Sequence, residues 1–258
     1  MLKPETISSA ANPLLKDVRH AIAHGGLTSQ GWCVAETAHL LEEALRSRCA
    51  VEVVLAAESA RDQLPRLGGS KLVVLPDGML QKISGTESSQ GVIALVAPPQ
   101  WKMEELFRGR ALVVVLDGLQ DPGNAGAIVR AAEAFGATGA MFLKGTAGPF
   151  NAKTLRASAG SLFRVPFLYG LEPALALAAF EEHAVARYAA VPGKAGAMAD
   201  LTVACALIVG NEARGVSREM RAGSQEVSIP TLAVESLNAA MAAGILLYEA
   251  SRQRGVRA

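Results

Sequence analysis

The chain has 258 residues, of which half are hydrophobic and 19% are charged, and its formal net charge is +1. This length allows one large or two modest globular domains, and the composition is unlike that of a disordered or fibrous protein. A net charge this close to zero excludes a strongly basic protein drawn as a whole onto nucleic acid, so any contact with RNA must be local.

The N-terminal part of the chain alternates between helical and strand-like patterns. A helical pattern covers 34–47 and another lies near Met79, and apolar runs occupy 51–57, 72–76 and 91–99. This alternation predicts a small α/β domain. The adjacent prolines of APPQWK continue neither a helix nor a strand, so they mark a linker. We therefore assign an N-terminal domain to 1–97, a linker to 98–109 and a second domain to 110–258.

The second domain contains a series of short apolar runs rich in β-branched residues, separated by segments with helical patterns. These runs lie at 111–118, 140–145, 162–170, 184–191, 206–212 and 226–230. They predict an α/β fold with a mainly parallel sheet and helices on both faces. In such sheets ligands bind beyond the carboxyl ends of the strands, so the residues after each run are the candidates for a site.

The first candidate segment is DPGNAGAIVRAAEAFG at 121–136. Asn124 stands where an N-cap belongs, and Gly136 ends the predicted helix. Arg130 lies off the apolar face of that helix, so a functional cation is reasonable at the carboxyl end of the preceding strand. A capped surface helix with a solvated arginine explains the same local pattern.

Two further segments place polar groups after strands. In LIVGNEARGVS, Glu212 is positioned to accept hydrogen bonds, and Gly215 allows backbone to approach a ligand closely. In VESLNAAMAAGILLYEASRQR, Ser236 or its neighbour begins a long apolar helix, and Asn238 lies beside it. A plain turn and an ordinary N-cap explain each segment equally well when it is taken alone.

Taken together and in this order, these segments resemble the three sequence motifs of the SpoU (TrmH-like) branch of the SPOUT RNA methyltransferases. The resemblance covers residues 111–254, including the intervening LRASAGSLFRVPF. More weakly, SSANPLLKDVR and SSQGVIALV are similar to the small α/β substrate-binding domain, resembling RNA-binding ribosomal proteins, that precedes many family members. The family usually has a glycine between Ile-Pro and Ser-Leu-Asn, whereas TLAVE lacks one and is a residue shorter.

The resemblance implies a trefoil knot in the second domain, an exception to the rule that chains do not knot. It also implies a homodimer formed through that domain, with S-adenosylmethionine as the methyl donor. The implied reaction is methylation of a ribose 2′-hydroxyl in RNA. The N-terminal domain makes ribosomal RNA of the large subunit a better candidate than tRNA.

The resemblance also assigns roles to individual residues. Backbone contacts to the adenosine part of the cofactor are implied for Gly210, Ile229 and Leu237, and the shaping of its pocket for Asn211 and Pro230. Polar motif positions that organise the catalytic site or contact RNA fall on Asn124, Glu212, Ser236 and Asn238.

Arg130 matches the arginine proposed in the family to activate the 2′-hydroxyl. Because arginine ordinarily stays protonated up to a pKa above about 12, two roles remain open. Arg130 is either an unusual base or a cation that positions phosphate and stabilises the developing alkoxide. Separately, the stretch 134–171 contains Lys144, Lys153, Arg156 and Arg164 and no acidic residue, which fits a solvated face as well as a surface that contacts phosphate. The family resemblance favours RNA contacts by Lys153, Arg156 and Arg164.

Other features exclude alternative classes. The three cysteines show no CxxC and the four histidines no HExxH spacing, so we expect no disulfide framework and no metal. The N-terminus lacks a signal-peptide pattern and the longest apolar run is too short to cross a bilayer, which predicts a cytoplasmic protein without a membrane partner. A nucleotide-binding dehydrogenase would need a GxGxxG, which DPGNAGA does not supply. A non-catalytic RNA-binding protein on the same scaffold stays open because of the missing glycine.

Overall fold

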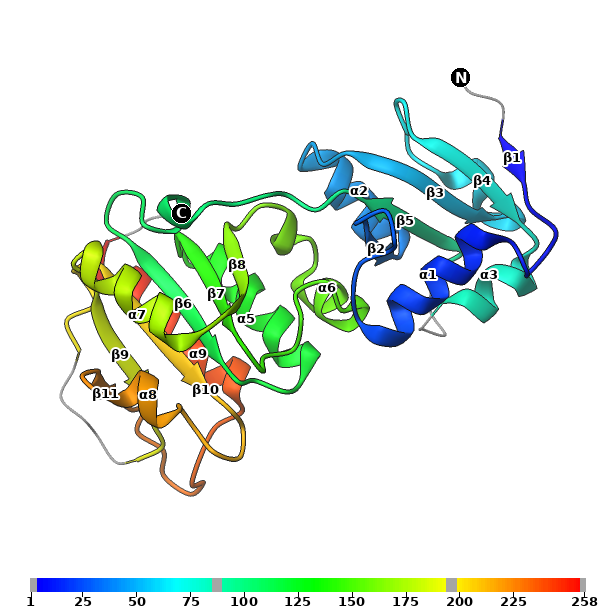
Figure 1. Cartoon of the computed structure of the whole chain (residues 1–258). Coiled ribbons are helices and arrows are strands. Elements are labelled where there is room, and N and C mark those ends of the chain that lie inside the picture. The colour runs from blue at the N-terminus through cyan, green and yellow to red at the C-terminus, as the bar shows by residue number, and fades with distance from the viewer. Residues whose placement is uncertain (1–3, 85–89, 194–198, 256–258) are drawn as a thin grey trace. The chain divides into compact units, whose positions relative to one another are not determined.

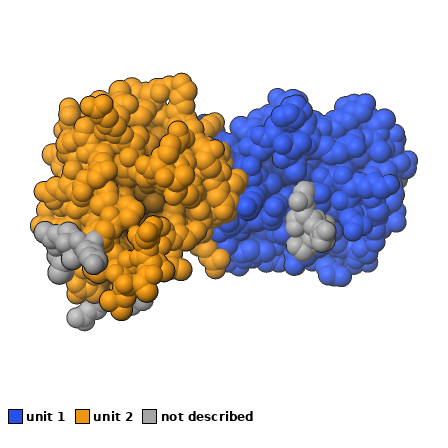
Figure 2. All heavy atoms as spheres, turned by 90° about the horizontal axis from the view of Figure 1, so that it is seen from below, with its two compact units in different colours: residues 1–100, 150–163 blue, residues 101–149, 164–258 orange. Residues whose placement is uncertain are grey.

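The computed structural model describes residues 4–84, 90–193 and 199–255. The chain divides into two compact units (Figure 2), unit 1 with residues 1–100 and 150–163 and unit 2 with 101–149 and 164–258. The chain thus leaves unit 2 after Pro149, contributes one segment to unit 1 and returns at Arg164. The domain limits assigned from the sequence did not anticipate this excursion, and they stay a prediction.

The described residues of unit 1 form a five-stranded sheet (Figure 1). Its strand order is β1 (Glu5–Thr6), β4 (Lys71–Leu75), β3 (Val51–Ala57), β5 (Val92–Val96) and β2 (Cys33–Glu36). The first three strands run parallel, and β5 pairs antiparallel with both β3 and β2. The accompanying helices are α1 (Pro13–His24), α2 (Ala38–Arg46), the 3-10 helix η1 (Glu58–Gln63) and α3 (Asp77–Ile83).

The helix predicted from residue 34 is wrong at its start. Residues 33–36 form the strand β2, and α2 begins at Ala38, with the Thr37 side chain accepting a hydrogen bond from the Leu40 N–H. A strand of four residues is too short for its alternation of apolar and polar residues to be recognised beside the helical pattern that follows. Pairing with β5 decides its conformation, because each residue of β2 is buried there.

Residues 150–163 belong to unit 1, although they lie between two parts of unit 2 in the sequence, and a buried ion pair holds them there. Helix α6 (Ala152–Ser158) packs against β2 and is followed by the 3-10 helix η2 (Ser161–Phe163). Arg156 of α6 forms an ion pair with the fully buried carboxylate of Glu36, which also accepts a hydrogen bond from the Ser84 hydroxyl at 2.8 Å. Burying a carboxylate is costly unless it is paired and hydrogen-bonded, so β2 and α6 depend on each other.

Unit 2 contains a six-stranded sheet in its described residues, and each neighbouring pair of strands is parallel, which confirms the predicted sheet. The strand order is β11 (Gln225–Val227), β9 (Ala186–Ala190), β10 (Cys205–Gly210), β6 (Leu112–Asp117), β7 (Gly139–Leu143) and β8 (Phe167–Leu171). The trefoil knot implied by the resemblance stays a prediction.

Helices cover both faces of this sheet. On one face, side chains of α4 (Met103–Leu106), α7 (Pro173–Glu182) and α8 (Arg218–Arg221) join the strands in one core, as Leu106, Phe180 and Met220 do. On the other face, α5 (Pro122–Ala134) and α9 (Ala239–Gln253) pack against each other and against the central strands. Both helices begin beyond the carboxyl ends of strands, which places their N-termini at the edge where ligands bind.

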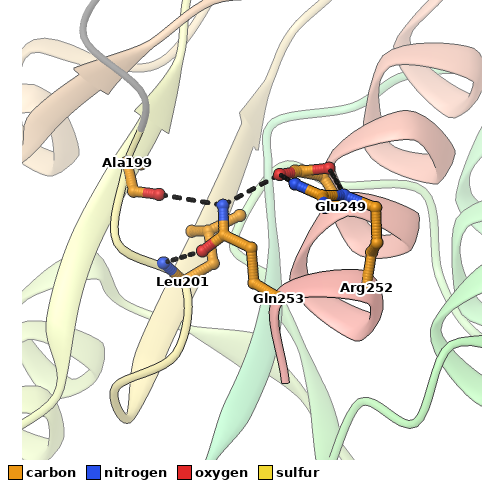
Figure 3. Close-up of polar contacts among 5 residues, drawn as sticks. All are labelled: Ala199, Leu201, Glu249, Arg252 and Gln253. Atoms are coloured by element: carbon orange, nitrogen blue, oxygen red, sulfur yellow. Dashed lines mark hydrogen bonds and ion pairs between the residues drawn. The ribbon is translucent and has the colours of Figure 1, made fainter. Parts of the chain in front are cut away.

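The far end of α9 is anchored to the segment that precedes β10 (Figure 3). The Gln253 side chain accepts a hydrogen bond from the Leu201 N–H at 2.8 Å and donates to the Ala199 carbonyl at 3.2 Å and to Glu249 at 2.9 Å. Hydrogen bonds from Arg252 and Gln253 lower the pKa of Glu249 to about 2. This end of the helix is therefore held in place while its N-terminus faces the candidate site.

Candidate active site

A cavity of about 750 Å³ lies at the carboxyl ends of β9, β10 and β11 in unit 2. Its walls are the residues after β9 (190–193), the turn after β10 (209–216), the loop that leads into α9, and the first turns of α9 itself. Small-molecule sites typically measure roughly 300–1,000 Å³. The cavity has both the size and the position expected of a ligand site in a parallel α/β sheet.

Gly210 stands where the turn after β10 folds back on itself. A Cβ atom added at Gly210 would lie 2.1 Å from the backbone of Gly215 and of Val216, which leaves no room for a side chain. Asn211 and Gly215 close the turn with two backbone hydrogen bonds of 3.0 and 2.8 Å. Gly215 has a φ of +69°, a left-handed conformation that favours glycine. The sequence of this turn thus brings bare backbone to the cavity.

Asn211 connects this turn to the end of the neighbouring strand. Its side-chain amide donates to the Gly118 carbonyl at 2.8 Å, and its side-chain oxygen accepts the N–H groups of Ala213 and Arg214 at 3.0 Å. These bonds tie the turn that lines the cavity to the end of β6, and the pocket-shaping role implied for Asn211 stays a prediction.

Asp117, a residue that the sequence analysis missed, makes a second such connection. Its buried carboxylate accepts the Ser217 N–H at 2.6 Å, joining the end of β6 to the segment after the turn. An aspartate at the end of an otherwise apolar strand was the signal available in the sequence.

Glu212 binds the start of α5. Its carboxylate accepts the backbone N–H groups of Gln120 at 3.3 Å and Asp121 at 3.4 Å, and the Asn124 side-chain amide at 3.1 Å. Burial raises the pKa of Glu212, but these hydrogen bonds and one from its own backbone N–H outweigh burial and hold the pKa below its ordinary value. Glu212 is thus an ionised acceptor that orders the loop between β6 and α5.

Asn124 and Asn238 extend this network to α9. The Asn238 side-chain amide donates to the Asn124 side-chain oxygen at 3.0 Å. The Asn238 oxygen caps α9 by accepting the N–H groups of Ala240 and Met241 at 3.0 and 3.2 Å. A continuous hydrogen-bonded chain therefore joins residues from all three motif segments.

Two N-caps differ from those predicted. Asn124 does not cap α5, because Asp121 does so by accepting the Gly123 N–H at 2.8 Å, with Pro122 at the first helical position. Helix α9 is capped by Asn238 and not by Ser236. In both places a polar side chain near the predicted position accepts the backbone N–H groups at the start of the helix. Because Asp121 caps α5, the Asn124 side chain can bond to Glu212 instead.

The glycine-free TLAVE segment still forms a wall of the cavity. Ile229, Ser236 and Leu237 line the cavity, whereas Pro230 is exposed and is not among the lining residues. The cofactor contacts that the resemblance implies for Ile229, Pro230 and Leu237 stay a prediction. The Thr231 hydroxyl donates to the Val234 carbonyl at 2.7 Å and closes a turn within the segment. The shortened loop therefore keeps a defined shape without the glycine.

Arg130 is exposed on α5, and it makes no hydrogen bond or ion pair with the residues that the structure describes. It does not line the cavity of its own chain. The structure therefore brings Asn124, Glu212 and Asn238 together and leaves Arg130 outside this network.

The predicted RNA-contacting cations have different surroundings. Lys153 is exposed on α6, and Arg156 pairs with Glu36 as described above. Arg164 pairs with Glu133, with one guanidinium nitrogen 3.0 Å from a carboxylate oxygen. An arginine already engaged by a carboxylate is less available to a phosphate, and the RNA-binding role of all three residues stays a prediction.

Within the described ranges, no group of three His, Cys, Asp or Glu side chains is arranged to hold a metal ion. No helix in those ranges combines the length and the apolar character needed to cross a bilayer. Cys33 and Cys205 are buried, as expected of small apolar side chains, and burial raises the pKa of Cys33 to about 12.

Two family models match the chain. The SpoU rRNA Methylase family matches residues 111–248, and an MRM3-like substrate binding domain matches residues 12–94. The chain is 31% identical over 246 residues to the 23S rRNA (guanosine(2553)-2′-O)-methyltransferase RlmP of Bacillus subtilis, covering 94% of this chain and 97% of the relative. It is 36% identical to the 23S rRNA (guanosine-2′-O-)-methyltransferase RlmB of Xanthomonas axonopodis, over 68% of this chain and 75% of the relative.

Among solved structures, the chain is similar to the SpoU methyltransferase AviRb of Streptomyces viridochromogenes in complex with the cofactor AdoMet. The TM-score is 0.81 at 25% identity, and the match covers 94% of this chain and 98% of the other. A match over 94% of this chain spans parts of both units.

Proposed function

The chain belongs to the SpoU rRNA methylase family, and on this premise we propose that it transfers a methyl group from S-adenosylmethionine to a ribose 2′-hydroxyl of large-subunit ribosomal RNA. The observation that carries the proposal is the cavity between the turn after β10 and the loop before α9. The names of two relatives specify a guanosine of 23S rRNA, which supports the ribosomal substrate. A ribosomal substrate also supports a cytoplasmic location.

The residues around the cavity fit the methyl donor. Gly210 lets the turn close tightly beside the cavity, because a side chain there would clash with the backbone of Gly215. Gly210, Ile229 and Leu237 all line the cavity, and we propose that their backbone groups bind the adenosine part. S-adenosylmethionine, when bound, supplies both the methyl group and its leaving group. The protein therefore has to align the 2′-hydroxyl and assist the loss of its proton, and we propose that it uses no metal.

Arg130 acts on the acceptor side of the reaction, as a base or as a cation that stabilises the developing alkoxide. The hydrogen-bonded chain of Glu212, Asn124 and Asn238 fixes the start of the helix that carries Arg130. We assign these three residues a positioning role, since their side-chain groups are already engaged with one another. Ser236 remains a candidate for contact with the RNA.

Two copies of the chain form a homodimer through α9. This helix presents an exposed apolar stripe of Met241, Ile245 and Tyr248, which are 57%, 39% and 54% exposed at helical spacing. Exposed apolar patches of this kind mark protein interfaces. Arg130 lies on the neighbouring helix α5 and outside the cavity of its own chain. We propose that each subunit of the dimer brings its Arg130 to the cavity of the other subunit.

The oligomeric state tests this dimer directly. Light scattering coupled to size-exclusion chromatography should report a dimer for the wild type and a monomer for Ile245→Glu. The matched control is Leu175→Glu on α7, because Leu175 is also exposed and apolar but lies on another helix. A dimer that persists in Ile245→Glu would remove α9 from the interface.

The test of the activity begins with isothermal titration of the protein with S-adenosylmethionine, with a nicotinamide dinucleotide as the control ligand. Saturable binding of the methyl donor alone is expected. The next step offers radiolabelled methyl donor with unmodified 23S rRNA and with tRNA, and incorporation into a ribose of the ribosomal RNA is expected. RNA binding without binding of the methyl donor would instead support the non-catalytic alternative.

A further inference from the structure

The cavity contains charged side chains that the proposed transfer does not use. Four charged residues line it, namely Glu212, Arg214, Arg221 and Glu235. Glu212 accepts the hydrogen bonds at the start of α5, and Arg221 is paired with Glu226 at 2.5 Å. Arg214 and Glu235 make no hydrogen bond or ion pair through their side chains with any residue in the described ranges. The cavity thus offers one cation and one anion to a ligand.

The position of Arg214 is fixed although its side chain is exposed. The Asn211 side-chain oxygen accepts the Arg214 N–H at 3.0 Å, and the next residue, Gly215, is bonded back to the Asn211 backbone. Because Gly210 leaves no space beneath this turn, the turn has little freedom to shift. The Arg214 side chain therefore lines the cavity from a backbone position that is well defined.

The signs of the two free charges indicate which part of a ligand they meet. An RNA backbone is a polyanion, so Glu235 on the same cavity would repel it. The methionine part of S-adenosylmethionine is a zwitterion with one carboxylate and one ammonium group, and a site with one cation and one anion complements it. A guanidinium also matches a carboxylate geometrically, because it donates two parallel hydrogen bonds.

We propose that Arg214 binds the carboxylate of the methionine part of S-adenosylmethionine. This inference rests on the proposed function, because it assumes that the cavity holds the methyl donor. It adds a contact to the methionine part of the cofactor, beyond the contacts proposed for the adenosine part. Arg214 thereby orients the methionine part and selects ligands that carry the carboxylate.

The experiment compares two ligands that differ only in this carboxylate: S-adenosylmethionine and its decarboxylated form. Both are titrated calorimetrically into the wild type, Arg214→Gln and the control Arg218→Gln, an exposed arginine on α8 that does not line the cavity. We expect Arg214→Gln to lower the affinity for S-adenosylmethionine about tenfold and that for the decarboxylated ligand less than about twofold. Arg218→Gln should change neither affinity.

The other outcomes separate the inference from the proposed function. Equal losses for both ligands in Arg214→Gln would overturn the inference and make Arg214 a residue that only shapes the turn. Unchanged affinities for both, with weaker and less salt-dependent RNA binding, would overturn it in favour of a phosphate contact. Failure of the wild-type protein to bind either ligand would instead overturn the proposed function.

Discussion

The Glu212 carboxylate accepts a hydrogen bond of 3.1 Å from the side-chain amide of Asn124, although 88 residues separate them. The same carboxylate accepts two backbone N–H groups at the start of α5, and Asn124 continues the contact to Asn238. The ionised carboxylate of Glu212 therefore connects the turn after β10 directly to the N-terminus of α5 and, through Asn124, to the N-terminus of α9.

Replacement of this carboxylate by Glu212→Gln should lower the free energy of unfolding at pH 7 by about 1 kcal/mol, since one amide cannot accept all of these hydrogen bonds. The folded pKa of Glu212 lies below its ordinary value. The stabilisation is thus fully present above about pH 4.3 and is lost as the pH falls through the folded pKa. Urea unfolding between pH 7 and pH 3 should show that the free energies of unfolding of the wild type and Glu212→Gln become equal only at the acid end of this range. Glu219→Gln, at an exposed position on α8, should match the wild type throughout.

A methyl side chain at Gly210 should abolish binding of the methyl donor. The added Cβ of Gly210→Ala would lie 2.1 Å from the backbone of Gly215, so the turn must open. We expect a loss of affinity for S-adenosylmethionine of at least about 100-fold in a calorimetric titration. The matched control is Gly78→Ala, because Gly78 lies in α3 with open space around it, and alanine there should stabilise the protein by about 0.5 kcal/mol. Normal affinity in Gly210→Ala would contradict the assignment of the cavity.

Arg130→Ala should abolish methyl transfer and leave the affinity for S-adenosylmethionine within about threefold, because Arg130 acts on the acceptor. Since its side chain is exposed, the free energy of unfolding should change by less than about 0.5 kcal/mol. Radiolabelled transfer, titration calorimetry and urea unfolding measure the three quantities. Equal loss of transfer and of cofactor affinity would remove Arg130 from the acceptor side.

Mixing two inactive variants tests whether Arg130 acts across the dimer. In a mixed dimer of Arg130→Ala and Gly210→Ala subunits, an arginine that serves the other subunit's cavity leaves one intact site. Random reassortment should then restore about a quarter of the wild-type rate. No recovery, despite mixed dimers detected by mass spectrometry, would place Arg130 and the cavity it serves on the same subunit.

Loss of the Arg156 side chain should destabilise unit 1 by about 3 kcal/mol, because the fully buried carboxylate of Glu36 would lose its ion pair with this guanidinium. Lys71→Ala is the matched control, since Lys71 and its partner Glu5 in the same unit are 53% and 47% exposed, and it should cost less than about 1 kcal/mol. Thermal unfolding measures both. The double variant Arg156→Ala with Glu36→Gln should recover part of the loss, and a failure to do so would show that packing of α6, not charge, holds the segment.

Gln253→Leu should loosen the segment before β10. The substitution leaves the Leu201 N–H and the Ala199 carbonyl without their partner, and Leu201 is buried. We expect a loss of about 1–2 kcal/mol in the free energy of unfolding and faster hydrogen exchange at the Leu201 amide. Gln63→Leu, at an exposed position in η1, is the control. Unchanged exchange at Leu201 would mean that the strand pairing of β10 holds the segment without the glutamine.

The sequence by itself determined the parallel strands of the second domain and the family. Apolar runs such as 111–118 and 206–212 predicted parallel strands because period and composition are local properties, and the three motif segments identified the SpoU methyltransferases. The tertiary structure alone decided which distant polar groups meet. Local pattern did not distinguish a cap at Asn124 from a partner for Glu212, or a strand at 33–36 from a helical start. It also could not foresee that Arg156, 120 residues away from Glu36, would neutralise a buried charge, because such pairings depend on how the chain packs and not on its spacing.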